Sequence, residues 1–307
     1  MISLRVGLHS VREIPRQAQA VTTAMKRLRF DAVKEEDLLL LEGSKDRPSF
    51  FILGSGHSVI RLTAENWEII RSGVSVGIGA WALHDFIPDF LAIESASDAP
   101  RAGAQEVPAP IDSSYRRALE VWSQRNDVIM RKPGILFFRP KNEDGDSRLS
   151  PLGQQFTDRT YLYGRYGATA RTKEELRHEF SLYLTLSRLG LIPEYLAFDT
   201  GGTVTRLISL AIRAGFSRIV LAGVDLKNSE YFWEADPTYL RKNGMNTFVS
   251  GQQPRSHKTE MASRGLPASV AITILAEVAK AKMRCDIQVA HASSWMANHL
   301  EVFDWAE

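Results

Sequence analysis

Cysteine is nearly absent from this sequence, which holds only Cys285 among its 307 residues. One thiol cannot build an internal disulfide framework, so the composition fits a reducing compartment, and we expect Cys285 to be a buried core residue. Apolar runs long enough to span a bilayer are also lacking, and the N-terminus shows no apolar signal segment, so we expect a cytoplasmic protein. The formal net charge of +2 is too small to indicate a nucleic-acid partner, but it leaves peripheral contact with an anionic inner membrane open.

Metal-binding and serine-hydrolase patterns are lacking as well. Seven histidines are present, and none is spaced from another His or from the cysteine as zinc ligands are. The run Gly54-Ser55-Gly56 is too short for the Gly-x-Ser-x-Gly nucleophile elbow. Asp144 and Asp146 form the one Asp-x-Asp, a pair that suits a divalent cation, but turn-forming residues flank them and favour a solvated loop. We therefore expect no bound metal.

The pattern of apolar segments predicts an α/β fold. Short apolar runs that end in glycine turns alternate with helical patterns, which is typical of a doubly wound, mainly parallel sheet of the Rossmann type. Thr63 and the pair Thr172 and Glu175 have the pattern of helix N-caps. We expect strands at residues 50–53, 74–81, 90–94, 134–138, 218–225 and 285–290, and helices at residues 63–70, 115–124, 172–189, 203–214 and 266–283.

The chain is expected to hold one main domain with two additions. Residues 1–49 form an N-terminal lead-in packed on that domain, which comprises residues 50–226 and 261–307. Residues 227–260 are polar and aromatic without clear periodicity, and so long a stretch inside a compact domain is usually a functional lid or a disordered segment, of which the aromatic residues favour the lid. We interpret it as a small lid.

A glycine turn directly after the first strand of the main domain is the leading candidate for a ligand site. Gly54 and Gly56 have no Cβ, and a strand, a glycine turn and a helix together suit a nucleotide's phosphate or ribose. The third glycine of the dinucleotide fingerprint is missing, so an ordinary strand-to-helix turn fits equally well. His257, between the lid and a helix, suits a general base or a plain surface histidine. Glu94 closes an apolar strand, as a ligand contact or as a solvated carboxylate.

Four short segments share their order with a known family. They are Gly54-Ser55-Gly56-His57-Ser58, Ala222-Gly223-Val224-Asp225, Ser256-His257-Lys258-Thr259 and His291-Ala292-Ser293-Ser294-Trp295-Met296-Ala297-Asn298. In this order the chain resembles the bacterial CMP-sialic-acid-dependent sialyltransferases, whose motifs look like Gly-Asn-Gly-Pro-Ser, Ser-Gly-Ile-Asp, a lone His after a lid, and Asn-Ser-Leu-Leu-Ala-Asn. The resemblance covers residues 50–94 and 203–303.

This resemblance implies a metal-independent, inverting glycosyltransferase on a GT-A-like Rossmann variant with a lid. Its donor is CMP-sialic acid or a related CMP-activated ulosonic acid, which serves as co-substrate with no further cofactor. The acceptor it implies is a glycan or lipooligosaccharide, and the assembly a homo-oligomer. The biological setting it implies is lipopolysaccharide or capsule biosynthesis in a bacterium.

The resemblance also implies roles for individual residues. By this analogy His257 is the general base, while Tyr231 and Lys227 stabilise the departing phosphate, with Lys227 where the family has a second tyrosine. Gly79 and Glu94 stand where the family has two donor-contacting asparagines, and a carboxylate there repels an acidic sugar nucleotide unless it is paired. The donor contacts it implies are Gly54, Ser55, Gly56 and Ser58 along CMP, Gly223, Val224 and Asp225 at ribose or base, and Thr203, Gly79 and Glu94 nearby.

Two other functions remain open from the sequence. A pterin pyrophosphokinase-like protein also carries a Gly-x-Gly-x-Ser loop, and it would need ATP and Mg²⁺. A nucleotide-binding homologue without catalysis is the other, because Lys227 and Gly79 depart from the family pattern. An α/β protein of unrelated function is the remaining alternative, since a fold does not determine an activity.

Overall fold

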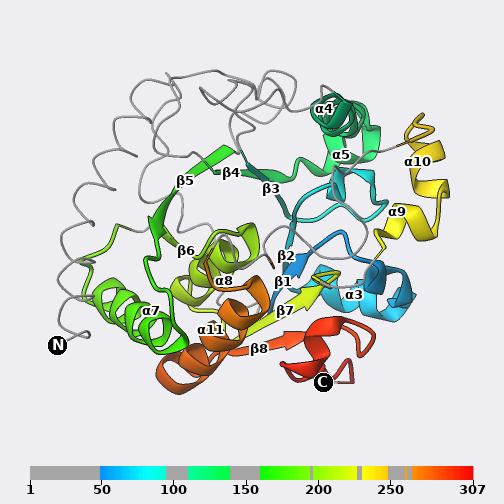
Figure 1. The fold of residues 1–307 in the computed structure, drawn as a ribbon. Helices are drawn as coiled ribbons and strands as arrows, with labels where there is room; N and C mark the ends of the chain where they lie inside the picture. Colours follow the sequence, from blue (N-terminus) through cyan, green and yellow to red (C-terminus); the bar gives the residue numbers. More distant parts are fainter. Residues whose placement is uncertain are drawn as a thin grey trace.

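A computed structural model of the chain describes residues 49–94, 110–138, 160–193, 196–226, 230–247, 260 and 265–306. Within these residues one eight-stranded sheet organises the molecule, and its strands pair in parallel (Figure 1). The expected doubly wound, mainly parallel sheet is thereby confirmed. The strands are β1 (Ser49–Leu53), β2 (Val74–Gly77), β3 (Phe90–Glu94), β4 (Gly134–Phe138), β5 (Thr160–Gly167), β6 (Leu196–Asp199), β7 (Arg218–Ala222) and β8 (Asp286–Val289).

The sheet order places β1 at a reversal of direction. The order is β6-β5-β4-β3-β2-β1-β7-β8, so the chain moves away from β1 on one side and then returns to its other side. Right-handed crossovers put helices on opposite faces when the direction reverses. The helices are α3 (Ala64–Ser72), α4 (Pro110–Gln124), α5 (Asn126–Arg131), α7 (Lys173–Arg188), α8 (Thr203–Arg213), α9 (Phe232–Ala235), α10 (Thr238–Lys242) and α11 (Ala268–Met283), with 3-10 turns η2 (His57–Arg61), η3 (Trp81–Leu83) and η7 (Trp295–Asn298).

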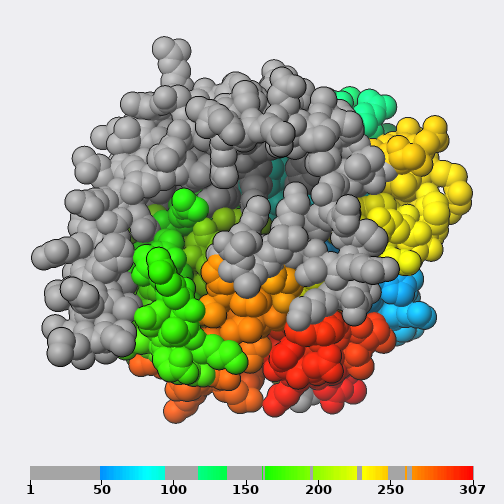
Figure 2. All heavy atoms as spheres, viewed as in Figure 1, coloured from blue at the N-terminus to red at the C-terminus, as the bar shows by residue number. Residues whose placement is uncertain are grey.

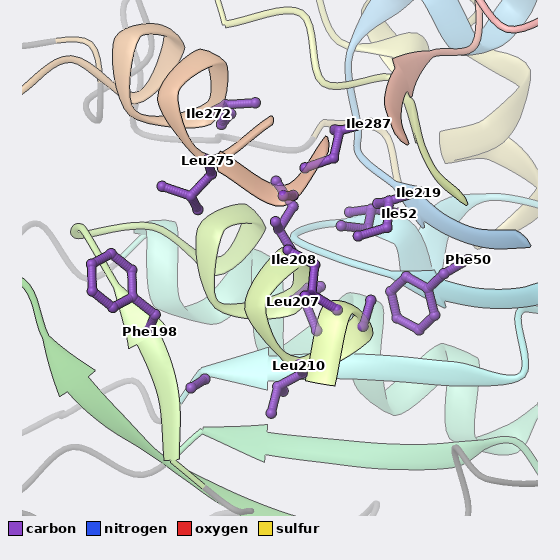
Figure 3. Close-up of a cluster of buried hydrophobic side chains, with 14 of the residues drawn as sticks. Phe50, Ile52, Phe198, Leu207, Ile208, Leu210, Ile219, Ile272, Leu275 and Ile287 are labelled. Carbon is purple, nitrogen blue, oxygen red and sulfur yellow. The ribbon is translucent and has the colours of Figure 1, made fainter. Parts of the chain in front are cut away.

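Two hydrophobic cores lie on the two faces of this sheet. Alternate residues of β1 divide between them: Phe50 and Ile52 belong to the core under α7, α8 and α11, whereas Phe51 and Leu53 belong to the core with α3, α4, α9 and α10. In Figure 3, side chains of α8 lie over Ile52 of β1 and the neighbouring β7. In Figure 2, α7 and α11, which cover the face of the sheet that holds Phe50 and Ile52, form part of the molecular surface beside the C-terminal segment. The doubly wound arrangement therefore buries β1 on both sides.

Local signals in the sequence explain where several helices begin and end. Thr63 caps α3 and Thr172 caps α7, as expected, and each forms a reciprocal capping box. Gly215, directly after the C-cap of α8, has a φ of +88°, a conformation that glycine adopts without strain. Cys285 is fully buried, which confirms its expected place in the core. Its pKa is raised to about 12 because burial disfavours the thiolate.

The structure also adds elements that the sequence patterns do not indicate. Strands β5 and β6 extend the sheet beyond β4, and neither is among the expected strands. Residues 230–247 of the expected lid form α9 and α10, and Phe232 and Trp233 are buried in the second core. Of the lead-in at residues 1–49, only Ser49 lies within the described residues.

Candidate nucleotide site

The candidate site lies where the chain leaves β1 and β7. These strands are neighbours at the point of reversal, and in open α/β sheets ligands bind outside the carboxyl ends of strands at such a switch point. Gly54, Ser55 and Gly56 follow β1, and Gly223, Val224 and Asp225 follow β7. Two segments far apart in the sequence are thus brought together at one edge of the sheet.

The glycines are required here because the two loops touch. Gly54 N donates to the Ala222 carbonyl at 2.7 Å, and Gly56 N donates to the Gly223 carbonyl at 2.8 Å. A Cβ on Gly54 would lie 2.4 Å from the Gly223 carbonyl oxygen, and one on Gly223 would lie 2.2 Å from the Gly54 carbonyl oxygen. Gly223 also has a φ of +68°. The contact that excludes side chains is therefore between two loops.

Asp225 and Ser58 join the same two loops through side chains. Ser58 N donates to Asp225 Oδ2 at 2.8 Å, and Ser58 Oγ donates to Asp225 Oδ1 at 2.7 Å. Both residues are buried, with Asp225 5% and Ser58 4% exposed. Hydrogen bonds to a carboxylate are short and strong, so this pair fixes the start of η2 against the β7 loop.

Two further serines extend these links to the neighbouring loops. Ser55 Oγ donates to the Ile78 carbonyl at 3.4 Å, which reaches the loop after β2. Ser294 Oγ donates to the Val224 carbonyl at 3.3 Å, which reaches the loop after β8. With Ser58, these hydroxyls connect four loops in the order of their strands, β2-β1-β7-β8. The four loops at the carboxyl edge of these strands are therefore linked to one another by serine hydrogen bonds.

Tyr231 lies beside the glycine turn. Its backbone forms an antiparallel bridge with Gly56, and Phe232 N donates to the Ser55 carbonyl at 3.1 Å. The half-buried Tyr231 ring stacks on Trp233 with ring centroids 4.4 Å apart and an interplanar angle of 6°. Since Phe232 and Trp233 are buried in the second core, the wall formed by residues 230–247 holds Tyr231 at the site.

His84 anchors the other end of this wall. Its ring stacks between Trp81, at 4.4 Å, and Tyr239, at 5.1 Å, and its Nδ1 accepts a hydrogen bond from Phe86 N. Burial lowers the His84 pKa to about 3, while nearby Asp85 opposes the shift. The imidazole is therefore neutral at neutral pH and serves as an aromatic contact between η3 and α10.

Two arginines share one buried carboxylate at the end of β6. Arg206 Nη1 lies 3.4 Å and Arg165 Nη1 3.8 Å from Asp199 Oδ2. Arg206 and Asp199 are each 4% exposed, whereas the Arg165 side chain is half exposed. Gly201 N also donates to Asp199 Oδ1 at 2.7 Å. The Asp199 carboxylate is therefore paired with one buried and one half-exposed arginine beside the N-terminus of α8.

The remaining expected site residues divide into three groups. Gly79, with a φ of +61°, lies beside the loop after β1, because a Cβ there would lie 3.2 Å from Ser55 Oγ. Glu94 ends β3, two strands from β1, and Thr203 begins α8, where its hydroxyl accepts from Arg206 Nη2 at 3.1 Å. Four candidates lie outside the described residues: His257, Lys227, Asp144 and Asp146.

Sequence reasoning missed the serine link from β8 and the charged cluster at β6. Ser294 lies in the last of the four motif segments, but the motif alone gave it no role. Its signal is a Ser-Ser pair soon after a strand, where Ser294 N-caps η7. Arg206 had a signal too, since a lone arginine interrupts the apolar run of α8 and needs a buried partner.

The described ranges hold neither a cluster of metal-ligating side chains nor a helix suited to span a membrane. Within them, no three His, Cys, Asp or Glu side chains gather closely enough to hold a metal ion. In the same part of the chain, no helix has the length and apolar character that a membrane span requires.

Comparison with known proteins gives a likeness of fold. No protein-family model and no curated protein sequence matches the chain. Among solved structures, it is similar to the sialyltransferase CstII from Campylobacter jejuni in complex with cytidine-5'-monophosphate, with 10% identity, 84% of this chain and 86% of that chain covered, and a TM-score of 0.42. It is also similar to the sialyltransferase CST-II in complex with a trisaccharide acceptor and CMP, with 10% identity, coverage of 83% and 85%, and a TM-score of 0.41. At this identity and these TM-scores, the likeness assigns neither residue roles nor an activity to this chain.

Proposed function

We propose that this protein is a CMP-dependent glycosyltransferase that moves sialic acid or a related ulosonic acid to a glycan hydroxyl. One observation carries the proposal. Two segments that resemble the family's nucleotide motifs, Gly54–Ser58 and 222–225, meet at the switch point and bond to each other through Ser58 and Asp225. Motifs that matched by chance would have no reason to converge at the place where an α/β sheet binds its ligand.

Hydrogen-bond donors beside the glycine turn suit such a donor molecule. CMP leaves as a phosphate monoester, so the site needs donors for the departing oxygens. The proposed role of Tyr231 is to donate a hydrogen bond to the departing phosphate, and its position beside Gly56 supports this role. Lys227, by the resemblance, supplies a cation for the same oxygens.

The reaction then needs one proton acceptor. In an inverting transfer, the acceptor hydroxyl attacks the anomeric carbon as the bond to the CMP oxygen breaks, and its proton passes to a base. His257 is the proposed base, because an imidazole with a pKa near neutrality suits proton transfer at physiological pH. CMP leaves as a phosphate monoester, so the proposed chemistry has no metal-dependent step.

The test is CMP release from a panel of CMP-activated acidic sugars in the presence of EDTA. The panel contains sialic, legionaminic and pseudaminic acids and Kdo, and donor hydrolysis is followed without an added acceptor. Wild type is compared with His257→Ala and with the matched control His178→Ala, which removes an exposed histidine on α7. We expect metal-independent release that falls by about 10²–10⁴-fold in His257→Ala only.

The other outcomes separate the alternatives. Turnover of ATP that requires Mg²⁺ would indicate the pyrophosphokinase-like activity. CMP binding without release from any donor would indicate an inactive homologue. Release that is equal in wild type and His257→Ala would refute the role of His257 while leaving the transferase intact.

A further inference from the structure

We propose that Asp225 and Ser58 are positioning residues, which set nucleotide affinity by holding the β1 and β7 loops together. In this proposal the Asp225 carboxylate serves the protein and makes no bond to the ribose. The inference rests on the proposed function, because it concerns the site that would hold CMP. It replaces the direct ribose or base contact that the resemblance implies for Asp225.

The first argument is the geometry of the carboxylate. Each Asp225 oxygen accepts a hydrogen bond from Ser58, at 2.8 Å from the backbone N and at 2.7 Å from Oγ. With only 5% of Asp225 exposed, little of its surface remains for a ligand. A buried carboxylate that already has two strong donors is stabilised where it is, so a ribose hydroxyl adds little to it.

The second argument is the glycine beneath the carboxylate. A Cβ on Gly56 would lie 2.5 Å from Asp225 Oδ2, so any side chain at this position would displace the carboxylate. Gly56 N also bonds to the Gly223 carbonyl, two residues before Asp225. The bare backbone of the glycine turn thus makes room for the Asp225–Ser58 pair, which explains why a glycine at position 56 occurs together with an aspartate at position 225.

The third argument concerns charge. The proposed donor carries two anionic groups, a phosphate and a sugar carboxylate, and an exposed carboxylate at the ribose would repel them. Within the pair, the negative charge of Asp225 faces Ser58 and is turned away from solvent. Holding the loops in their bound spacing lowers the cost of ordering them when nucleotide binds, which raises affinity without a new contact.

The experiment measures CMP affinity by calorimetry for wild type, Ser58→Ala, Asp225→Ala and the double variant. Each is titrated with CMP, 2′-deoxy-CMP and 3′-deoxy-CMP. We expect each single variant to weaken CMP binding about 10- to 100-fold, the usual scale for a hydrogen bond to a charged group. We expect the same factor with both deoxynucleotides, and a double variant no more than about threefold weaker than the worse single variant.

Two further variants separate positioning from general instability. Asp225→Asn can still accept from Ser58 N and can donate to Ser58 Oγ, so it is expected to restore most of the affinity lost in Asp225→Ala. Ser123→Ala removes another buried serine hydroxyl, one that bonds to Glu120 within α4, and it is expected to leave CMP affinity unchanged. For Ser58→Ala, the donor KM should rise while kcat at saturating donor stays within about threefold.

Three results would overturn the proposal. An Asp225→Ala penalty that disappears with either deoxynucleotide would mean that Asp225 binds the ribose directly. Wild-type affinity in Ser58→Ala would mean that the pair does not set the site. If wild type itself binds no CMP, the proposed function fails first and this role fails with it. Should Asp225→Ala not fold, Ser58→Ala and Asp225→Asn still decide between the first two results.

Discussion

Acid should destabilise this protein through His84, and the size of the effect follows from its burial. The imidazole is buried between Trp81 and Tyr239, and its pKa is about 3 in the folded protein, compared with about 6.5 in an unfolded chain. Burial is the main cause. The charges of Arg125 and Lys242 lower the pKa further, and Asp85 partly opposes them.

The sign follows from proton binding. Between pH 6.5 and 3 the unfolded chain binds a proton at His84 and the folded protein does not, so stability falls as the pH falls through this window. At pH 5 the loss is about 2 kcal/mol, and at pH 4 it is about 3 kcal/mol. Since a typical domain is stable by about 5–15 kcal/mol, this single group removes a sizeable part of the margin.

The assay is urea unfolding at pH 7, 6 and 5 for wild type and His84→Phe. The variant keeps an aromatic ring but has no titrating group at this position. Its absolute stability can differ from that of wild type, but the difference between the two pH dependences gives the contribution of the His84 proton. We expect the free energy of unfolding of wild type to fall by about 2 kcal/mol more than that of the variant between pH 7 and 5. Parallel pH profiles would refute the reasoning, because they would show that His84 titrates alike in both states.

Two further predictions concern the loops and the sheet edge away from His84. Gly223→Ala puts an alanine in the left-handed region with its Cβ 2.2 Å from the Gly54 carbonyl oxygen. Thermal unfolding should therefore show a larger loss of stability than in Gly215→Ala, where the Cβ meets open space and only the backbone strain of about 1–2 kcal/mol remains. Equal losses in the two variants would contradict the loop contact. Glu179→Gln should destabilise by about 1.5–3 kcal/mol, because its buried carboxylate accepts hydrogen bonds from two backbone amides at residues 169 and 170. The exposed control Glu174→Gln should change stability by less than about 0.5 kcal/mol, and a similar loss in both variants would argue against this.

The sequence predicts much of the fold because its strands are buried on both faces. Apolar runs such as residues 50–53 and 218–222 followed by glycine turns need no tertiary information to be assigned. Strand β5 escapes the same reasoning because glycines and Arg165 interrupt its apolar residues. Strand β6 escapes it because Asp199 ends its apolar residues after only three positions, whereas the equally short β2 and β8 lie within the longer patterns at residues 74–81 and 285–290.

Residues 230–247 show a different limit of sequence reasoning. Their aromatic residues favour a lid, which stays a prediction, and the pattern does not indicate that Phe232 and Trp233 are core residues whose partners lie far away in the sequence. The helices α9 and α10 have four and five residues, too short to show a helical period. What decides their structure is the set of aromatic contacts with His84 and Trp81, edge-on from Phe232 and stacked from Tyr239, which no local pattern reveals.

The candidate site shows why a motif can point to particular residues and still leave their roles undetermined. The sequence supplies an aspartate after β7 and a serine after β1, and both a ribose contact and a loop clamp require these residue types. Ser58 and Asp225 are 167 residues apart, so only the adjacency of β1 and β7 in the sheet reveals that they bond. A resemblance that compares motifs one at a time cannot distinguish the two roles, whereas a nucleotide that lacks one hydroxyl can. The role proposed for Ser58 and Asp225 therefore depends on their contact with each other, and the order of strands in the sheet makes that contact.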